Sequence, residues 1–188
     1  MIAKGAILSL LVFAAALAPA ADLTAYQLAA KGDKYIGTQS KDKIVQIRSD
    51  RSVGSLTPSV WYVVYYDPDA MLKAVQVKFG GGQMLEVSHP LRLIEPVTGD
   101  DRVLDHEKLK IDSNQALQTA TAQPILKNLV LHSAQFWLQA GDLGPEWKIE
   151  LWAAKIHDPS QDADIGAIYI SAADGSIVKN DLHPENVN

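Results

Sequence analysis

The chain has 188 residues, a formal net charge of −5 and no cysteine, and 47% of its residues are hydrophobic. The missing cysteines exclude disulfides, thiolate metal sites and cysteine nucleophiles, and the mild acidity argues against a nucleic-acid partner, which needs a basic surface. The length suits one ordinary domain or two small ones, and the apolar share is enough to build a core.

The first twenty residues have the pattern of a secretory signal peptide. Lys4 is their only charge, an apolar run follows it, and Ala18-Pro19-Ala20 places small residues before a cut after Ala20. The apolar run is shorter than the ~20 residues that a membrane span needs, so an uncleaved anchor is the less favoured alternative. We therefore expect a periplasmic or secreted protein with no stable membrane span after cleavage.

The region 21–87 is predicted to begin with a helix and to continue with strands. The helix is expected over 23–30, with Asp22 or Thr24 as its cap and Gly32 as its stop. Alternation of apolar and polar residues then predicts four strands. These are 43–48, 60–66, 73–79 and 84–87.

The region 110–188 is predicted to follow the same order of elements. Asp112 and Gln115 have the spacing of a capping box for a helix that ends near Ala122. A register break is expected near His132-Ser133, a loop over 158–164, and a tight hairpin turn at Asp174-Gly175. The expected strands are 129–138, 146–155, 165–172 and one that begins at 177.

The two regions align in order, because Trp61 matches Trp147 at an offset of 86 residues and Gly81 matches Gly175 at 94, where the second region carries an extra loop. Such self-similarity indicates an internal duplication. The fold class predicted from it is α+β, with two repeats over 21–87 and 110–188, each a helix packed on a three- to four-stranded antiparallel meander. Residues 88–109 are predicted to be a linker. Because each unit is small, we expect the two to pack together.

The second region resembles a known family. The segments "DSNQALQTA", "EWKIELW" and "ISAADGSIV" are similar to the PepSY domain, a small α+β module of exported bacterial proteins. The resemblance covers about 110–179, whereas the first region matches only in outline. It implies a noncatalytic module that inhibits or regulates secreted peptidases or sits beside membrane assemblies. A cystatin-like fold is a close architectural neighbour, and the resemblance implies no catalytic residue.

The motifs of common active sites are missing from the sequence. The five histidines form no His-Glu-x-x-His string, and no Gly-x-Ser-x-Gly is present. The acidic segment 158–164 lacks the order of an EF-hand, so a polar loop is favoured over a calcium site. We therefore predict that the protein is not an enzyme, with no catalytic residue, no metal site and no cofactor.

Aromatic residues are expected on both faces of the sheet. If Trp61 and Trp147 point into the core, alternation turns a second set outward. This set is Tyr62, Tyr66, Trp137 and Trp152. Exposed Trp and Tyr are favoured at protein interfaces, so these four residues are the candidate partner-binding site. The alternative is that they pack the two repeats against each other.

The sequence thus favours an exported, noncatalytic binding or regulatory module, such as a peptidase-inhibitor-like or envelope-associated protein, with a protein or peptide partner. The alternative is a small-molecule carrier or hydrolase with a pocket between the two repeats. A filled core and an aromatic outer patch would favour the first function, and a cleft with convergent His, Asp or Glu would favour the second. The oligomeric state is left open.

Overall fold

The computed structural model describes residues 23–90 and 103–187, which form two helices and eight strands. The helices are α1 (Ala25–Gly32) and α2 (Ser113–Thr121). The strands are β1 (Ile44–Ser49), β2 (Val60–Tyr66), β3 (Ala74–Gly80), β4 (Gln83–Ser88), β5 (Leu129–Gly141), β6 (Gly144–Lys155), β7 (Asp158–Ser171) and β8 (Ile177–Leu182). Short 3₁₀ turns cover His106–Lys108, Pro124–Leu126 and Pro184–Asn186. The predicted signal peptide lies outside the described residues, as does most of the predicted linker.

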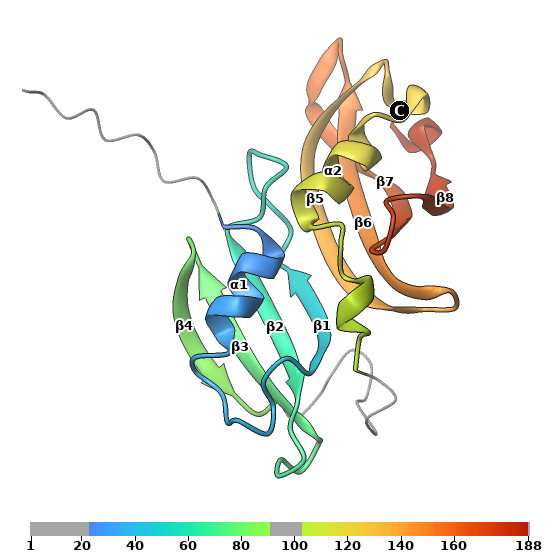
Figure 1. Cartoon of the computed structure of the whole chain (residues 1–188). Coiled ribbons are helices and arrows are strands. Elements are labelled where there is room, and N and C mark those ends of the chain that lie inside the picture. The colour runs from blue at the N-terminus through green and yellow to red at the C-terminus, as the bar shows by residue number, and fades with distance from the viewer. Residues whose placement is uncertain (1–22, 91–102, 188) are drawn as a thin grey trace, which may run out of the picture.

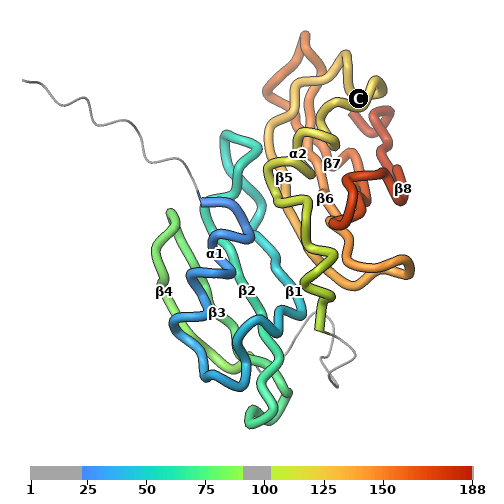
Figure 2. The backbone as a smooth tube through the Cα atoms, viewed as in Figure 1, coloured from blue at the N-terminus to red at the C-terminus, as the bar shows by residue number. Residues whose placement is uncertain are grey.

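The eight strands form one antiparallel sheet in the order β4-β3-β2-β1-β5-β6-β7-β8. Both helices lie on the same face of this sheet, α1 over the β1–β4 side and α2 over the β5–β8 side (Figure 1). The opposite face carries no helix among the described residues, and we call it the outer face. The tube in Figure 2 follows the long, curved hairpin of β5 and β6.

The prediction of two repeats, each with its own helix-covered meander, is wrong. β1 pairs with β5, with Ile47 opposite Leu138 and Arg48 opposite Trp137, so all strands belong to a single sheet. Joining β1 to β5 also covers two strand edges whose N–H and C=O groups would otherwise be unpaired. Both helices and strands of both sides contribute to one hydrophobic core.

Two buried serines extend the short β1–β5 seam. The Oγ of Ser49 accepts a hydrogen bond from the N–H of Phe136 at 3.0 Å. The Oγ of Ser52 accepts from the N–H of Ala134 at 2.8 Å, and the Ser52 N–H donates to the Ala134 carbonyl at 2.9 Å. These bonds replace ladder bonds where the backbones diverge, so buried polar groups stay paired across the seam.

Aromatic rings link the two sides of the core beneath the helices. Trp61 lies 5.5 Å from Phe136, and Phe136 lies 6.3 Å from Trp147 in an edge-to-face arrangement. Tyr26 of α1 stacks on Trp147 at 6.0 Å. The indole N–H of Trp61 donates to the Pro58 carbonyl at 3.0 Å, so this ring is buried with its polar atom satisfied.

The N-termini of the two helices share a cap. Asp112 Oδ1 accepts from the Ser113 N–H at 2.6 Å at the start of α2 and from the Tyr26 N–H at 3.2 Å in the first turn of α1. Ser113 Oγ accepts from the Ala25 N–H at 3.1 Å. The capping box predicted for Asp112 and Gln115 is confirmed, and α1 has its own box made by Thr24 and Gln27. One carboxylate therefore satisfies first-turn donors of both helices.

Two local predictions for the long hairpins have opposite outcomes. The register of β5 against β6 shifts between Leu131 and Ser133, which confirms the predicted break near His132. The predicted loop over 158–164 is wrong, because these residues belong to β7 and Trp152 of β6 pairs with Asp164. Pro159 lies beside the hairpin turn, where its missing N–H costs little, so the polar composition does not interrupt the strand.

Candidate functional site

The four residues predicted as a partner-binding site, Tyr62, Tyr66, Trp137 and Trp152, all lie half-buried on the outer face. They come from strands β2, β5 and β6. Their sequence neighbours on these strands, such as Trp61 and Phe136, are buried under the helices. The structure therefore places the four residues on one face, spread across the sheet.

Each of these four rings has a cation over it. The guanidinium of Arg48 lies 4.0 Å from the Tyr62 ring centre, and that of Arg51 lies 4.2 Å from Trp152. Lysine ammonium groups lie over Trp137 and Tyr66, and one more lies near Tyr62. These pairs are Lys78 with Tyr62 at 5.3 Å, Lys148 with Trp137 at 4.9 Å, and Lys43 with Tyr66 at 5.5 Å.

From β3 to β8, cations and aromatic residues alternate in a single row across the sheet, and Glu86 of β4 ends the row. Following the pairing register from edge to edge gives Glu86, Lys78, Tyr62, Arg48, Trp137, Lys148, Tyr169 and Lys179, one residue from each strand. We call this the cross-strand row. Directly opposed side chains on neighbouring strands are close enough to stack, and cation–aromatic contacts add about 0.5–1 kcal/mol at exposed sites.

Two cations of the cross-strand row, Lys148 and Lys179, form ion pairs within the outer face. Lys148 Nζ lies 2.7 Å from Glu150, and Lys179 Nζ lies 3.0 Å from Asp181. Partial burial lowers the pKa of Lys148, but the hydrogen bond and charge of Glu150 together outweigh it, and the pKa is raised. The rings and cations of this face thus already have partners, and an incoming protein would have to compete with them.

A polar pocket of about 360 Å³ lies where the 51–54 segment meets β5 and β7. Arg51 pairs with Asp162, donates to Ser133 Oγ at 2.7 Å and stacks on Trp152. His132 also lines this pocket. Arg51 is fixed by three partners, so its main effect is to fasten the segment after β1 to the β6–β7 hairpin.

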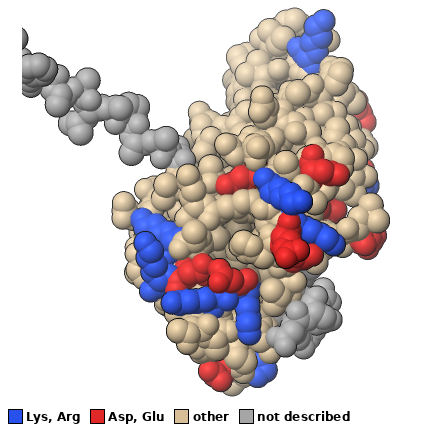
Figure 3. Space-filling model, viewed as in Figure 1, with Lys and Arg blue, Asp and Glu red and all other residues tan. Residues whose placement is uncertain are grey.

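A second, larger pocket of about 470 Å³ lies between the N-terminal ends of α1 and α2, and we call it the interhelix pocket. Its lining residues are Leu23, Thr24, Gln27, Thr57, Pro58, Trp61, Ser113, Asn114, Leu117 and Phe136. The rings of Trp61 and Phe136 are almost completely buried, so they form its floor. In Figure 3 most charged side chains of this helix-bearing face lie in the middle and lower part of the view, and a further cationic group lies at the top.

None of the described residues that line the interhelix pocket has an ionisable side chain. Its polar members are hydroxyl and amide side chains from the helix ends and from Thr57. General acid–base catalysis uses side chains that exchange a proton near neutral pH, and the described lining has no such side chain.

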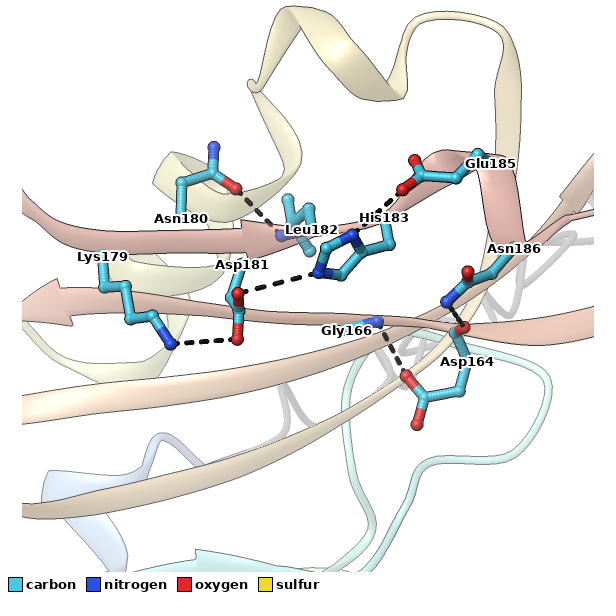
Figure 4. A network of polar contacts seen from close by, with 9 residues as sticks. All are labelled: Asp164, Gly166, Lys179, Asn180, Asp181, Leu182, His183, Glu185 and Asn186. Carbon is cyan, nitrogen blue, oxygen red and sulfur yellow. Dashed lines mark hydrogen bonds and ion pairs between the residues drawn. The ribbon is translucent and has the colours of Figure 1, made fainter.

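A surface network at the C-terminal end is shown in Figure 4. His183 Nδ1 lies 3.0 Å from Glu185 and its Nε2 lies 3.7 Å from Asp181, which also binds Lys179. The hydrogen bond to Glu185 is the main reason why the pKa of His183 is raised. These side chains are about half exposed or more, so the network is a set of surface ion pairs between β8 and the turn that follows it.

The same region attaches the chain end to β7. The His183 N–H donates to the Ile165 carbonyl at 2.7 Å, and Asn186 Nδ2 donates to the Asp164 carbonyl at 3.2 Å. Gly166 has φ of +91°, and a Cβ there would lie 2.2 Å from the Asp181 carbonyl oxygen. Only glycine allows β8 to approach so closely. Val187 is buried in the core, so the last described residues belong to the fold.

Within residues 23–90 and 103–187, no group of three or more His, Asp or Glu side chains is placed to hold a metal ion. The described helices are also too short to cross a membrane. Comparisons with protein-family models, curated proteins and solved structures found no match. The PepSY resemblance of 110–179 stays a prediction.

Sequence reasoning missed the interhelix pocket as a defined site. A pocket between the two halves was expected only as an alternative, with convergent charged groups. Each wall carries a capping box, Thr24 with Gln27 and Asp112 with Gln115, which could have marked two helix starts. The sequence contains no signal that these two starts lie side by side, because that depends on the β1–β5 pairing.

Proposed function

We propose that this chain is an exported, noncatalytic binding protein whose ligand site is the interhelix pocket. The observation that carries the proposal is a cavity of about 470 Å³ with the rings of Trp61 and Phe136 as its floor and a lining without charge. Ligand sites in proteins are typically concave, mostly apolar and about 300–1,000 Å³ in volume. The expected ligand is uncharged and mainly apolar.

Burial of apolar surface supplies the binding energy in this proposal. Leu23 and Leu117 flank the aromatic floor, and Pro58 adds to the wall. An apolar group placed there leaves water at about 25 cal/mol for each Å² that it buries. A charged group would lose its hydration without meeting an opposite charge on the lining.

Export is part of the proposal and rests on the signal-peptide pattern of residues 1–20. A protein or peptide partner on Tyr62, Tyr66, Trp137 and Trp152 stays a prediction, since those rings carry cations that a partner would have to displace.

The test is saturable binding of the neutral dye Nile red to the mature protein, followed by its emission. Leu117→Trp fills the pocket from α2 and Thr57→Trp from the segment before β2, and each is expected to weaken dye binding at least tenfold. Gln118→Trp adds the same ring to an exposed position of α2 outside the lining. It should bind the dye as the unmodified protein does.

Two results would overturn the proposal. One is dye binding that does not saturate in the unmodified protein. The other is equal loss of binding in Gln118→Trp and in the two filling variants. Thermal melting of each variant confirms that the comparison is made between folded proteins.

A further inference from the structure

Four of the five polar side chains that line the interhelix pocket have their oxygen atoms engaged by the backbone; Thr57 is the fifth. Gln27 Oε1 accepts from the Thr24 N–H at 3.0 Å, and Asn114 Oδ1 accepts from the Gln115 N–H at 2.9 Å. Thr24 Oγ1 accepts from the Gln27 N–H at 3.4 Å, and Ser113 Oγ accepts from the Ala25 N–H at 3.1 Å. All four side chains therefore act as caps and as lining at once.

This use of the oxygens determines what is left for a ligand. Only the oxygen of a side-chain amide can accept from an N–H, so the amide orientation of Gln27 and Asn114 is fixed. Their NH₂ groups remain as donors, and the hydroxyl groups of Thr24 and Ser113 keep their hydrogens. The rim of the pocket thus offers mainly hydrogen-bond donors above an apolar floor.

Hydrogen-bond donors alone would bind an anion as well as a neutral oxygen atom. The negative charge of Asp112 beside the pocket favours the neutral ligand. Its carboxylate accepts from the N–H groups of both Tyr26 and Ser113, and Ser113 itself lines the pocket. The partial positive charges of both helix ends are therefore balanced by a full negative charge beside the pocket. No lysine or arginine is among the described lining residues, so a carboxylate ligand would meet repulsion without an ion-pair partner.

We infer that the ligand of the interhelix pocket is a neutral molecule with an apolar body and an acceptor oxygen of the carbonyl type, such as a ketone, an ester or an amide. The inference rests on the proposed function and adds its chemical selectivity. The apolar body lies against Trp61 and Phe136, and the carbonyl oxygen accepts from the NH₂ group of Gln27 or of Asn114.

The test uses three ligands with the same aromatic body, measured by displacement of Nile red from the mature protein. These are 2-acetylnaphthalene, 2-ethylnaphthalene and 2-naphthoate, which carry a carbonyl, a methylene of similar shape and a carboxylate. One hydrogen bond contributes a modest net amount, so the acetyl compound is expected to bind about 3- to 10-fold more tightly than the ethyl compound. The naphthoate is expected to bind more weakly than the acetyl compound.

Variants then locate the donors. Asn114→Leu and Gln27→Leu keep the approximate size of the side chain and remove its NH₂ group. At least one of them should bring the preference for acetyl over ethyl close to one while ethyl binding is retained. Gln118→Leu, on the exposed side of α2, is the matched control and should keep the preference.

The outcomes separate the two proposals. Nile red binding that does not saturate contradicts the proposed function itself, and failure of all three ligands to displace a bound dye overturns only the selectivity. Equal binding of the acetyl and ethyl compounds in the unmodified protein leaves the pocket function intact and overturns the selectivity. Tightest binding of the naphthoate also overturns it, because the pocket would then be an anion site. A preference that survives both Leu variants overturns the assignment of the donors.

Discussion

The helix-covered face and the outer face of the sheet use the same aromatic residue types in different ways. On the covered face, Trp147 is fully buried and its indole N–H donates to the Ile111 carbonyl at 2.7 Å. Tyr65 is also fully buried, and its hydroxyl donates to the Ala29 carbonyl at 2.7 Å. On the outer face, Tyr62 and Trp137 are half-buried and stack with Arg48 and Lys148.

The difference shows that a strand rich in aromatic residues does not by itself identify a binding surface. On the covered face the helices exclude water, so the rings pack on one another and their polar atoms bond to the backbone. On the outer face, neighbouring strands supply long cations whose stems and charges cover the rings. On the covered face, Trp61 and Phe136 also line a cavity, the interhelix pocket.

The largest expected effect on stability is tested with two adjacent residues of β5 whose side chains point to opposite faces. Phe136→Ala removes a ring that is 1% exposed and contacts Trp61 and Trp147, so it should reduce the free energy of unfolding by about 3–5 kcal/mol. Trp137→Ala removes a half-buried ring and should cost only about 1 kcal/mol. Urea unfolding measures the free energy of unfolding of both variants. An equal loss of stability in the two would contradict the proposed difference between the faces.

The second prediction concerns the cap shared by the two helices. Asp112→Ala should cost about 1–2 kcal/mol of stability, since one carboxylate serves the first turns of both α1 and α2. Asp105 is the control, because its side chain accepts from the Glu107 N–H in a short, exposed 3₁₀ turn. Asp105→Ala should change stability by less than about 0.5 kcal/mol. A loss from Asp112→Ala no larger than the control would contradict the shared cap.

Much of the local structure could be predicted from the sequence. Alternation located β2 correctly, and the spacing of Asp112 and Gln115 located the start of α2. The pairing of β1 with β5 could not be predicted, because the apolar alternation around Ile47 and Leu138 also occurs on other strands such as β2 and β6. The outward direction of Tyr62 follows from alternation, but the cation above it depends on which strand lies alongside.

A third prediction tests whether the cation above Tyr62 contributes to stability. Arg48→Met and Tyr62→Leu form a double-mutant cycle with an expected coupling of about 0.5–1 kcal/mol. The distance of 4.0 Å between the guanidinium and the ring centre is the basis of this value. Burial lowers the pKa of Arg48, yet arginine keeps its charge at neutral pH, so the coupling should persist at pH 7. A coupling near zero would mean that the cations only cover the rings.

The smallest effect on stability is expected at the exposed end of the cross-strand row. There, Asp181 forms ion pairs with both Lys179 and His183. The hydrogen bond with Glu185 raises the pKa of His183 above its ordinary value of 6.5. Its stabilising contribution is complete below the unfolded-state pKa and is lost as the pH rises through the folded-state pKa. An NMR titration of the His183 ring should therefore give a midpoint above 6.5, and Glu185→Gln should lower it. A midpoint at or below 6.5 would mean that this network does not stabilise the protonated His183 ring.

The β1–β5 seam also has a consequence for the order in which the chain folds. The hairpins on either side join neighbouring segments, whereas Ser49 and Phe136, which bond across the seam, are 87 residues apart in the chain. Closing so long a loop costs more entropy than closing a hairpin, so the seam is expected to be a late event in folding. The interhelix pocket has walls from both sides of the seam and is therefore completed only by that event. A bound ligand would contact both sides of the seam, so it should slow the separation of β1 from β5 and thereby lower the unfolding rate.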